Sequence, residues 1–508
     1  MFTCLLFLLL YQLPTSIFLS MKILYHSTNN RKEKVGFKEA ILNGIASNYG
    51  LYMMERPRLP KISEADIKSM AKKSYAQIAH RVLLPFVIPD ISEKDFEDIL
   101  EDAYNKSVIT VEIQNITSSS YLMWLSKGPT YSFKDYAARF FGRVLNYFLG
   151  KDNLKRIVVV ATSGDTGGAV AHALLGLENV VNVVFFPEGS ISEEQRRQMT
   201  TLGKNIYAFA VNGDFDVCQE LAKNMLADRN FAEEAFSDPH IFTSANSISL
   251  GRLLPQAVYP FFAYSRICSW GEKLIISIPS GNFGDMMGTV IAKEMGLPVE
   301  KIVVGVNENR EFPDFLETGN YIVRPSIWSP STAMVVSHPS NLARLVEFYG
   351  GHMFDERDVK TGKVKRPGVI ARMPDMERLR NDIFSVSINN EEHYITIRSV
   401  YEKYGVILDP HGAVGWKALE LFNGGLHSKP AVVYETADPG KFPRDIKMAI
   451  GKKPEIPEGI KNQQNLPERV IRIESPPQVD EAGKKRMSAN QYAEAKEKIR
   501  DLLGDIFI

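Results

Sequence analysis

The chain has 508 residues, 44% of them hydrophobic and 24% charged, which is enough for two or three globular domains with sizeable cores. Its 60 basic residues equal its 60 acidic residues, so no overall charge favours nucleic acid or an anionic membrane, and we expect a small-molecule substrate. The cysteines Cys4, Cys218 and Cys268 lie far apart, which argues against a zinc site and a disulfide framework. We therefore expect no metal site, and a reducing compartment.

Residues 1–20 differ from the rest of the chain. Their apolar run, Cys4 to Leu13, has no Lys or Arg before it, lacks a clear small-residue cleavage site and is too short to span a membrane. Met21 follows at once. We interpret residues 1–20 as a leader or a wrongly assigned start, with Met21 as the true start and the cytoplasm as the location. A targeting segment is the alternative.

Residues 21–105 are predicted to form a helix-rich N-terminal domain. Apolar residues recur at helical spacing after Phe37 and Ser63, and Ser92 begins a sequence typical of a helix cap. No residue in this region has the character of a catalytic group.

The next segment, Gly128 to Tyr136, has one lysine at its centre. Lys134 follows a Gly-Pro turn and Phe133, and the apolar run at 136–148 is typical of a helix. A lysine at such a junction can lose contact with water, which lowers the pKa of its amine and makes it a nucleophile toward carbonyl groups. A solvated surface lysine is the alternative for any single lysine, but the motifs on either side favour the nucleophile.

A glycine-rich turn follows a predicted strand. The β-branched run at 156–161 predicts a buried parallel strand, and residues 162–168 read Thr-Ser-Gly-Asp-Thr-Gly-Gly before a predicted helix. This order of elements directs backbone N–H groups and the helix dipole at an anion, and hydroxyls from Thr162, Ser163 and Thr166 add donors for a carboxylate or phosphate. A tight turn rich in helix-capping residues is the alternative.

The same order of elements recurs later in the chain. Residues 274–278 predict a strand, and Pro279-Ser-Gly-Asn-Phe-Gly-Asp285 leads into a helix. A second backbone cradle for an anion is expected from Ser280, Gly281, Asn282 and Gly284. Neither turn has Walker-loop or Gly-x-Gly-x-x-Gly spacing, so nicotinamide and flavin chemistry have little support.

The repeated strand–helix units predict two open, mostly parallel α/β sheets. We place them in domains at 106–250 and 251–455, which share one site, and expect residues 456–508 to form a C-terminal extension over one domain. Thr436 ends a predicted strand, where open sheets place ligands.

A polar group of residues lies between the two turns. Asn246, Ser247 and Arg252 supply amide, hydroxyl and guanidinium groups that suit a phosphorylated or carboxylated substrate. A satisfied loop with a surface arginine is the alternative.

In this order, the motifs resemble those of the threonine synthase family, the bacterial and fungal branch of the fold type II pyridoxal-phosphate enzymes. The likeness extends from Met21 to the neighbourhood of Lys452. It is carried by a lysine motif at 128–135, a substrate loop at 161–167, a cofactor-phosphate loop at 279–285, Ser244-Ala-Asn-Ser-Ile, His338-Pro-Ser-Asn, Asp409-Pro-His-Gly-Ala-Val and Glu435-Thr-Ala-Asp-Pro-Gly-Lys-Phe442.

The resemblance implies a role for each motif. Lys134 would bind pyridoxal 5′-phosphate covalently and then act as the proton shuttle. Asp165 would lie near the phenolic oxygen of the ring, and Thr436 would present a hydroxyl to the pyridine nitrogen. The cofactor phosphate would be bound by Ser280, Gly281, Asn282, Phe283 and Gly284. The substrate carboxylate would meet Thr162, Ser163 and Thr166, and the substrate phosphate would meet Asn246, Ser247 and Arg252.

The implied reaction converts O-phospho-L-homoserine and water to L-threonine and phosphate, by γ-elimination followed by β-addition of water. No nucleic acid, membrane or metal is implied as a partner, and the sequence leaves the oligomeric state open.

Several positions depart from the family pattern. They are Trp124, Ser126 and Lys127 before the lysine motif, Ser249 and Thr332 where asparagine is usual, and Asp438 and Gly440 after Thr436. Two alternatives therefore stay open. One is a related phospho-lyase that releases 2-oxobutyrate because water fails to add, and the other is a catalytically silent relative that binds a partner.

Overall fold

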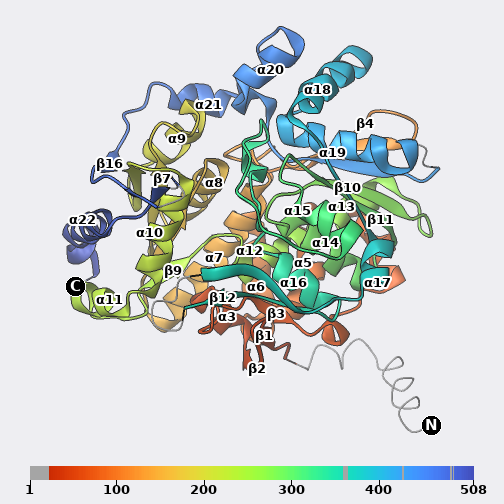
Figure 1. Cartoon of the computed structure of the whole chain (residues 1–508). Coiled ribbons are helices and arrows are strands. Elements are labelled where there is room, and N and C mark those ends of the chain that lie inside the picture. Colours follow the sequence, from red (N-terminus) through yellow and green to blue (C-terminus); the bar gives the residue numbers. More distant parts are fainter. Residues whose placement is uncertain (1–21, 359–363, 426–427, 481–482, 484, 508) are drawn as a thin grey trace.

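The computed structural model describes residues 22–358, 364–425, 428–480, 483 and 485–507. Two large sheets with their helices lie beside one another, and a small N-terminal sheet packs at one end (Figure 1). The predicted α/β class, with two mostly parallel sheets and a helix-rich N-terminal region, is confirmed. None of the described helices is both long and apolar enough to cross a membrane.

The N-terminal region begins with a three-stranded antiparallel sheet in the order β2-β1-β3. Its strands are β1 (Tyr25–Ser27), β2 (Asn30–Val35) and β3 (Tyr52–Met54). The sequence pattern did not indicate this sheet, because β2 is an edge strand in which only Val35 is buried. The helices are α3 (Phe37–Asn43), η1 (Arg56–Arg58), α4 (Glu64–Ser69), η2 (Met70–Lys72), α5 (Tyr75–Val87) and α6 (Glu93–Ala103). The expected cap at Ser92 is present, since its side chain accepts a hydrogen bond from the N–H of Asp95.

The five-stranded sheet is parallel throughout, in the order β16-β8-β7-β6-β9. Its strands are β6 (Arg156–Ala161), β7 (Val180–Pro187), β8 (Ile206–Val211), β9 (Phe242–Ser244) and β16 (Val470–Ile473). Every residue of β6, β7 and β8 is buried, as parallel strands covered by helices require. The helices on this side are α7 (Lys134–Asp152), α8 (Asp165–Leu174), α9 (Glu193–Thr200), α10 (Phe215–Ala227), α11 (Arg229–Phe236) and α22 (Ala489–Phe507).

The six-stranded sheet has the order β14-β11-β10-β15-β5-β4 and is parallel apart from the β4–β5 pair. Its strands are β4 (Glu112–Asn115), β5 (Ser120–Trp124), β10 (Leu274–Pro279), β11 (Val299–Val306), β14 (Ile383–Ser387) and β15 (Ala431–Glu435). The helices here are α12 (Leu250–Leu253), η3 (Leu254–Ala257), α13 (Val258–Ile267), α14 (Gly284–Glu294), α15 (Glu311–Thr318), α16 (Leu342–Phe348), α17 (Met376–Asp382), α18 (Asn390–Tyr404) and α19 (Pro410–Leu421).

The remaining elements are short. They are η4 (Thr332–Met334), η5 (Phe422–Gly425), η6 (Pro439–Lys441), α20 (Pro443–Ile450), α21 (Glu458–Gln463), and the strand pairs β12 (His352–Arg357) with β13 (Val364–Arg372) and β17 (Gln478–Val479) with β18 (Lys485–Arg486). Neither sheet is confined to one of the predicted segments. The strands β4 and β5 lie within 106–250 but join the six-stranded sheet, and β16 lies within 456–508 but joins the five-stranded sheet. The division at 106–250, 251–455 and 456–508 stays a prediction.

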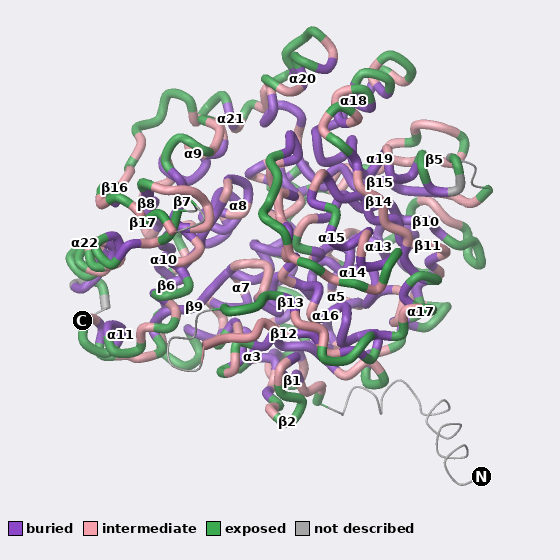
Figure 2. The backbone as a smooth tube through the Cα atoms, in the orientation of Figure 1, coloured by how far each residue is buried: buried purple, intermediate pink, exposed green. Residues whose placement is uncertain are grey.

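Buried residues run through the strands of both sheets (Figure 2). The chain leaves β6 at Thr162, β10 at Ser280 and β15 at Thr436, and each of these residues is buried. The carboxyl ends of parallel strands are where open α/β sheets bind ligands, so the fold brings the predicted loops to such an edge.

One buried arginine links the N-terminal sheet to the loops of the second sheet. Arg344 is fully buried, and its guanidinium donates to the backbone oxygen of Tyr52 at 3.0 Å, to that of Ile248 at 2.7 Å and to Asn341 Oδ1 at 2.6 Å. Asn341 in turn donates its side-chain N–H to the backbone oxygen of Asn282 at 2.9 Å. Arg344 therefore supports the predicted cofactor-phosphate loop from behind.

Replacing Arg344 by leucine is expected to lower the free energy of unfolding by about 3 kcal/mol, because three acceptors in the interior lose a charged donor. The shift of the urea midpoint measures this loss. Arg31→Leu is the control: the Arg31 side chain is 56% exposed where it meets Glu347, so its removal should cost less than about 1 kcal/mol. Equal midpoint shifts for the two variants would contradict the role given to Arg344.

Candidate functional site

The turn before Lys134 is held in a strained shape by its own neighbours. Tyr131 has φ of 57°, a left-handed conformation that costs a non-glycine residue free energy. The Asp135 carboxylate accepts the backbone N–H of Thr130 at 2.9 Å and its hydroxyl at 2.6 Å. The N–H of Phe133 donates to the backbone oxygen of Thr436 at 2.8 Å. These bonds fix the first residue of α7, which is Lys134, against the end of β15.

Lys134 lies in the interior, as the sequence predicted for a reactive lysine. Its side chain is 14% exposed, and its Nζ lies 4.0 Å from Asp165 Oδ2 and 4.7 Å from the centre of the Phe133 ring. Burial lowers the pKa of the Lys134 amine, the charge of Asp165 opposes that shift, and the charges of Lys441 and Arg252 add to it. The amine is therefore uncharged at a lower pH than a surface lysine.

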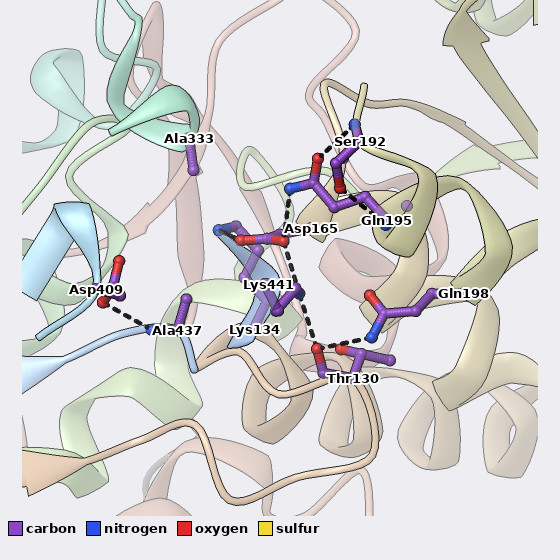
Figure 3. Close-up of polar contacts among 12 residues, drawn as sticks. Thr130, Lys134, Asp165, Ser192, Gln195, Gln198, Ala333, Asp409, Ala437 and Lys441 are labelled. Atoms are coloured by element: carbon purple, nitrogen blue, oxygen red, sulfur yellow. Dashed lines mark hydrogen bonds and ion pairs between the residues drawn. The ribbon is translucent and has the colours of Figure 1, made fainter. Parts of the chain in front are cut away.

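Asp165 is the partner of a second lysine as well (Figure 3). Its Oδ1 lies 2.7 Å from Lys441 Nζ and accepts Gln195 Nε2 at 2.9 Å. Burial alone would raise the pKa of Asp165, but the charges of Lys441 and Lys134 outweigh it and hold that pKa well below its usual range. Lys441 also donates to the backbone oxygen of Thr130 at 2.8 Å.

The first glycine turn is organised by Thr162. Its hydroxyl accepts the N–H of Gly164 at 3.0 Å and of Gly167 at 2.8 Å, so it shapes the turn from inside. Gly164 has φ of 138°, which an L side chain rarely adopts, and Asp165 begins α8 directly after it. Ser163 and Thr166 are half-buried on the same turn. The predicted contact of these three hydroxyl residues with a substrate carboxylate stays a prediction.

The second turn has the form of an anion cradle. No described residue accepts a hydrogen bond from the N–H groups of Gly281, Asn282, Phe283 or Gly284 at the start of α14. Phe283, directly before α14, has φ of 61°, a left-handed conformation. The Ser280 hydroxyl bonds to Asp285, whose pKa is raised by burial. Free N–H groups at a helix N-terminus bind phosphate, so the predicted role of this loop agrees with its geometry.

A short segment closes over the second turn. A Cβ atom on Gly281 would lie 2.8 Å from Met334 Cα and 3.0 Å from the backbone oxygen of Ala333. The N–H of Ala333 donates to His411 Nε2 at 3.1 Å, and His411 Nδ1 lies 2.5 Å from Asp409 Oδ1. Nδ1 therefore carries the ring proton and donates it to Asp409, while Nε2 is the acceptor.

The three residues predicted to meet a substrate phosphate lie together. Arg252 is buried and donates to the backbone oxygen of Ala245 at 2.7 Å, while its Nε has no partner among the described residues. Asn246 Oδ1 is likewise buried without a partner, and the Ser247 hydroxyl lies 2.9 Å from that of Ser340. Burial lowers the pKa of Arg252 to about 10, so it still carries its charge at neutral pH.

The departures from the family pattern have local explanations in part. Lys127 lies 5.3 Å from the centre of the Trp124 ring, and Asp438 accepts the N–H of Gly440 at 2.9 Å. A Cβ on Gly440 would lie 2.5 Å from the backbone oxygen of Glu455, so glycine lets the C-terminal segment pass.

The other departures lie deeper or nearer the second turn. Ser126 and Ser249 are fully buried with unpartnered hydroxyls among the described residues, which nothing in the structure explains. Thr332 begins the segment that covers Gly281.

Several residues of the site were not predicted individually. Lys441 and Asp285 stand inside motifs that the sequence analysis quoted, but only their burial and pairing reveal their importance. Gln195 lies on α9, and its bond to Asp165 depends on how α8 and α9 pack. Among the described residues, no group of three or more His, Cys, Asp or Glu could hold a metal ion.

Family models match three successive parts of the chain. Threonine synthase N terminus matches residues 24–104, pyridoxal-phosphate dependent enzyme matches 120–436, and threonine synthase, C-terminal, matches 412–482. Curated relatives agree. The threonine synthase of Pseudomonas aeruginosa is 34% identical over 441 residues, 85% of this chain and 92% of that protein. The Saccharomyces cerevisiae enzyme is 31% identical over 494 residues, 89% of this chain and 95% of that protein.

Solved structures give the same result. A threonine synthase from Brucella melitensis with bound pyridoxal phosphate has a TM-score of 0.81 and 31% identity, and covers 94% of this chain and 99% of its own. The yeast threonine synthase has a TM-score of 0.82 and 28% identity, with 95% and 99% covered.

The residues present fit pyridoxal phosphate. An aldehyde needs a buried amine of lowered pKa, which Lys134 supplies, and a phosphate needs N–H groups that no described residue accepts, which the loop at 281–284 supplies. The Thr436 side chain, at the end of β15, brings a hydroxyl to the same edge.

Gly281→Ala is expected to weaken the binding of pyridoxal phosphate at least about tenfold, because the new methyl group displaces the backbone of Met334 or distorts the cradle. An absorbance titration of the cofactor-free chain measures the dissociation constant. Gly150→Ala, on the exposed end of α7 where only Asn179 Nδ2 comes within 3.4 Å, should leave it unchanged. Unaltered affinity in the Gly281 variant would show that the cradle lies elsewhere.

Proposed function

The chain belongs to the threonine synthase family of pyridoxal-phosphate-dependent enzymes, and we propose that it converts O-phospho-L-homoserine and water into L-threonine and phosphate. One observation carries the proposal: the buried amine of Lys134 is near enough to Arg252, and to Asp285 in the loop of the anion cradle, for their charges to affect its pKa, and the Nε of Arg252 has no partner among the described residues. This arrangement suits a phosphorylated cofactor and a phosphorylated substrate together.

The cofactor would be held by four features of this chain. Lys134 would bind its aldehyde, the N–H groups at 281–284 would bind its phosphate, the Thr436 hydroxyl would face its ring nitrogen, and Asp165 would face its phenolic oxygen. Bound pyridoxal phosphate supplies an electron sink for the carbanions that form at Cα and then Cβ of the substrate. Because a hydroxyl carries no charge, it would favour an unprotonated ring nitrogen, and the ring would then withdraw electrons less strongly than a ring whose nitrogen is protonated beside a carboxylate.

Once the substrate has displaced it, Lys134 would move protons at the substrate carbons. Its lowered pKa supplies an uncharged amine for proton removal, and the interior position keeps bulk water from competing. The turn held by Asp135 keeps the amine in reach while the bond to the cofactor is open.

The substrate would be bound by its two anionic ends. Arg252 and Asn246 have buried, unpartnered atoms that suit the phosphate, and the turn at 162–168 suits the carboxylate. Thr162 would act by shaping that turn, since its hydroxyl is already bonded within it, and the hydroxyl donors to the substrate would be the half-buried Ser163 and Thr166.

The product distinguishes this function from its alternatives. The full chain with pyridoxal phosphate and O-phospho-L-homoserine is expected to release threonine and phosphate in equal amounts. Phosphate with 2-oxobutyrate would establish the phospho-lyase instead, and would point to the buried hydroxyl of Ser249 near the substrate residues. A chain that gains no visible absorbance with the cofactor would establish the silent relative.

Lys134→Ala should lower kcat at least about a thousandfold, since it removes both the cofactor bond and the proton carrier. The rate of phosphate release measures the loss. Lys301→Ala is the control: Lys301 is a half-buried lysine on β11 that, among the described residues, donates hydrogen bonds only to the backbone oxygens of Arg380 and Asn381, and its loss should leave kcat within about twofold. Phosphate release at the normal rate from the Lys134 variant would refute the assignment.

Arg252→Met is expected to raise KM for the phosphorylated substrate about tenfold to a hundredfold, the value of a charged hydrogen bond, with little change in cofactor affinity. Initial rates against substrate concentration give KM. Arg266→Met is the control, because Arg266 lies at the far end of α13 and bonds to the backbone oxygens of Met70 and Ala71. An unchanged KM in the Arg252 variant would show that the substrate phosphate binds at another place.

A cytoplasmic location is part of this proposal. The two described cysteines, Cys218 and Cys268, are free thiols, as is usual in a reducing compartment.

A further inference from the structure

Lys441 carries its charge in the protein interior, where a charged group raises the free energy of the folded state. It follows β15 in η6, and its side chain is fully buried. Moving an ammonium group into the interior costs several kcal/mol unless a partner compensates. Its two partners are Asp165 at 2.7 Å and the backbone oxygen of Thr130 at 2.8 Å, and both belong to the active site.

Two lysines therefore share one carboxylate. Asp165 meets Lys441 at 2.7 Å and Lys134 at 4.0 Å, so the closer ion pair is not the one with the reactive lysine. Figure 3 shows both lysine side chains reaching toward Asp165, with Gln195 on its other side. A carboxylate so engaged stabilises a charge on Lys134 less than an otherwise free carboxylate would.

The contact also joins the two sheets. Asp165 begins α8 beside the five-stranded sheet. Lys441 is the last residue of η6, which follows β15 of the six-stranded sheet. The second bond of Lys441 reaches the turn that precedes Lys134, and Gln198 of α9 donates to the same oxygen, that of Thr130, at 3.1 Å. Lys441 thus sets both the charge and the position of the groups around the amine.

We propose that Lys441 is a positioning residue of the active site, whose charge engages Asp165 and so leaves the amine of Lys134 uncharged and nucleophilic. This inference rests on the proposed function only in taking Lys134 as the cofactor lysine. Other titratable groups also lie near these residues, and they stay in place in the test: Arg252 and Asp285 near Lys134, His411 near Asp165, and Asp135 and Asp438 near Lys441.

The test follows the amine of Lys134 directly. The cofactor-free full chain is mixed with pyridoxal phosphate at a series of pH values, the bond is trapped with borohydride, and peptide mapping gives the initial rate at Lys134. Lys441→Met removes a positive charge and keeps the length of the side chain. We expect its rate–pH profile to shift upward by about one unit or more, because Lys134 then holds its proton to higher pH.

Two further variants separate charge from packing. Lys441→Arg keeps the charge and should return the midpoint to within about half a unit of the unmodified chain. Asp165→Asn removes the negative charge and should shift the midpoint downward, opposite to Lys441→Met. A purely structural role would not give opposite signs, and midpoints that coincide in all variants would overturn the inference.

The outcome is separable from that of the proposed function. If the unmodified chain shows no trapping at Lys134, the cofactor lysine itself is wrong, and this inference falls with it. If trapping occurs with the expected shifts but threonine is not produced, the inference stands and the reaction differs. Should Lys441→Met not fold, the downward shift in Asp165→Asn and the restored midpoint in Lys441→Arg remain decisive.

Discussion

The site depends on how the charge of one buried carboxylate is divided. Asp165 cannot lose its charge at neutral pH, because Lys441 and Lys134 both stabilise it, and it cannot turn away, because Gln195 holds it from the side. Lys441 is the closer partner of Asp165, and burial, aided by the charge of Lys441, lowers the pKa of the Lys134 amine even though Asp165 opposes that shift. Without this division a buried lysine beside a carboxylate would form an ordinary ion pair and be a poor nucleophile.

A second group of buried acids, Glu435 and Asp409, helps to fix the segment that covers the phosphate cradle. Burial, and after it the neighbouring Asp409, raise the pKa of Glu435 well above its usual range. Asp409 accepts a hydrogen bond from Nδ1–H of His411, and Nε2 of the same ring accepts the N–H of Ala333, which covers Gly281. The same Asp409 accepts the N–H of Ala437, next to Thr436, at 3.3 Å. The cradle and the strand end that would face the ring are therefore positioned by one network.

The sequence predicted what is local and periodic. The strand at 156–161, the helix after Lys134 and the two glycine turns could be read from hydrophobic pattern and turn chemistry, and the structure confirms these elements. It could not predict β2, whose charged residues hide the strand pattern, or the return of β16 to the first sheet, since strand partners are set by long-range packing. Lys441 stands in a motif that the sequence analysis quoted, but its partner, Asp165, lies 276 positions earlier in the chain. No local sequence pattern predicts a contact between residues so far apart.

The charge balance of the site explains why a neutral chain suits an anionic substrate. Lys134, Lys441 and Arg252 bring three basic groups into one interior, while burial raises the pKa of Asp135 and Asp285 and so weakens their compensation. Asp165 is the carboxylate there whose pKa is held low. A buried guanidinium whose Nε has no partner among the described residues raises the free energy of the site, and a bound phosphate would lower it again. If Arg252 binds the substrate phosphate, as proposed, affinity there would come partly from relieving a cost that folding has already imposed, and this would select for a phosphorylated ligand over a neutral one of the same shape.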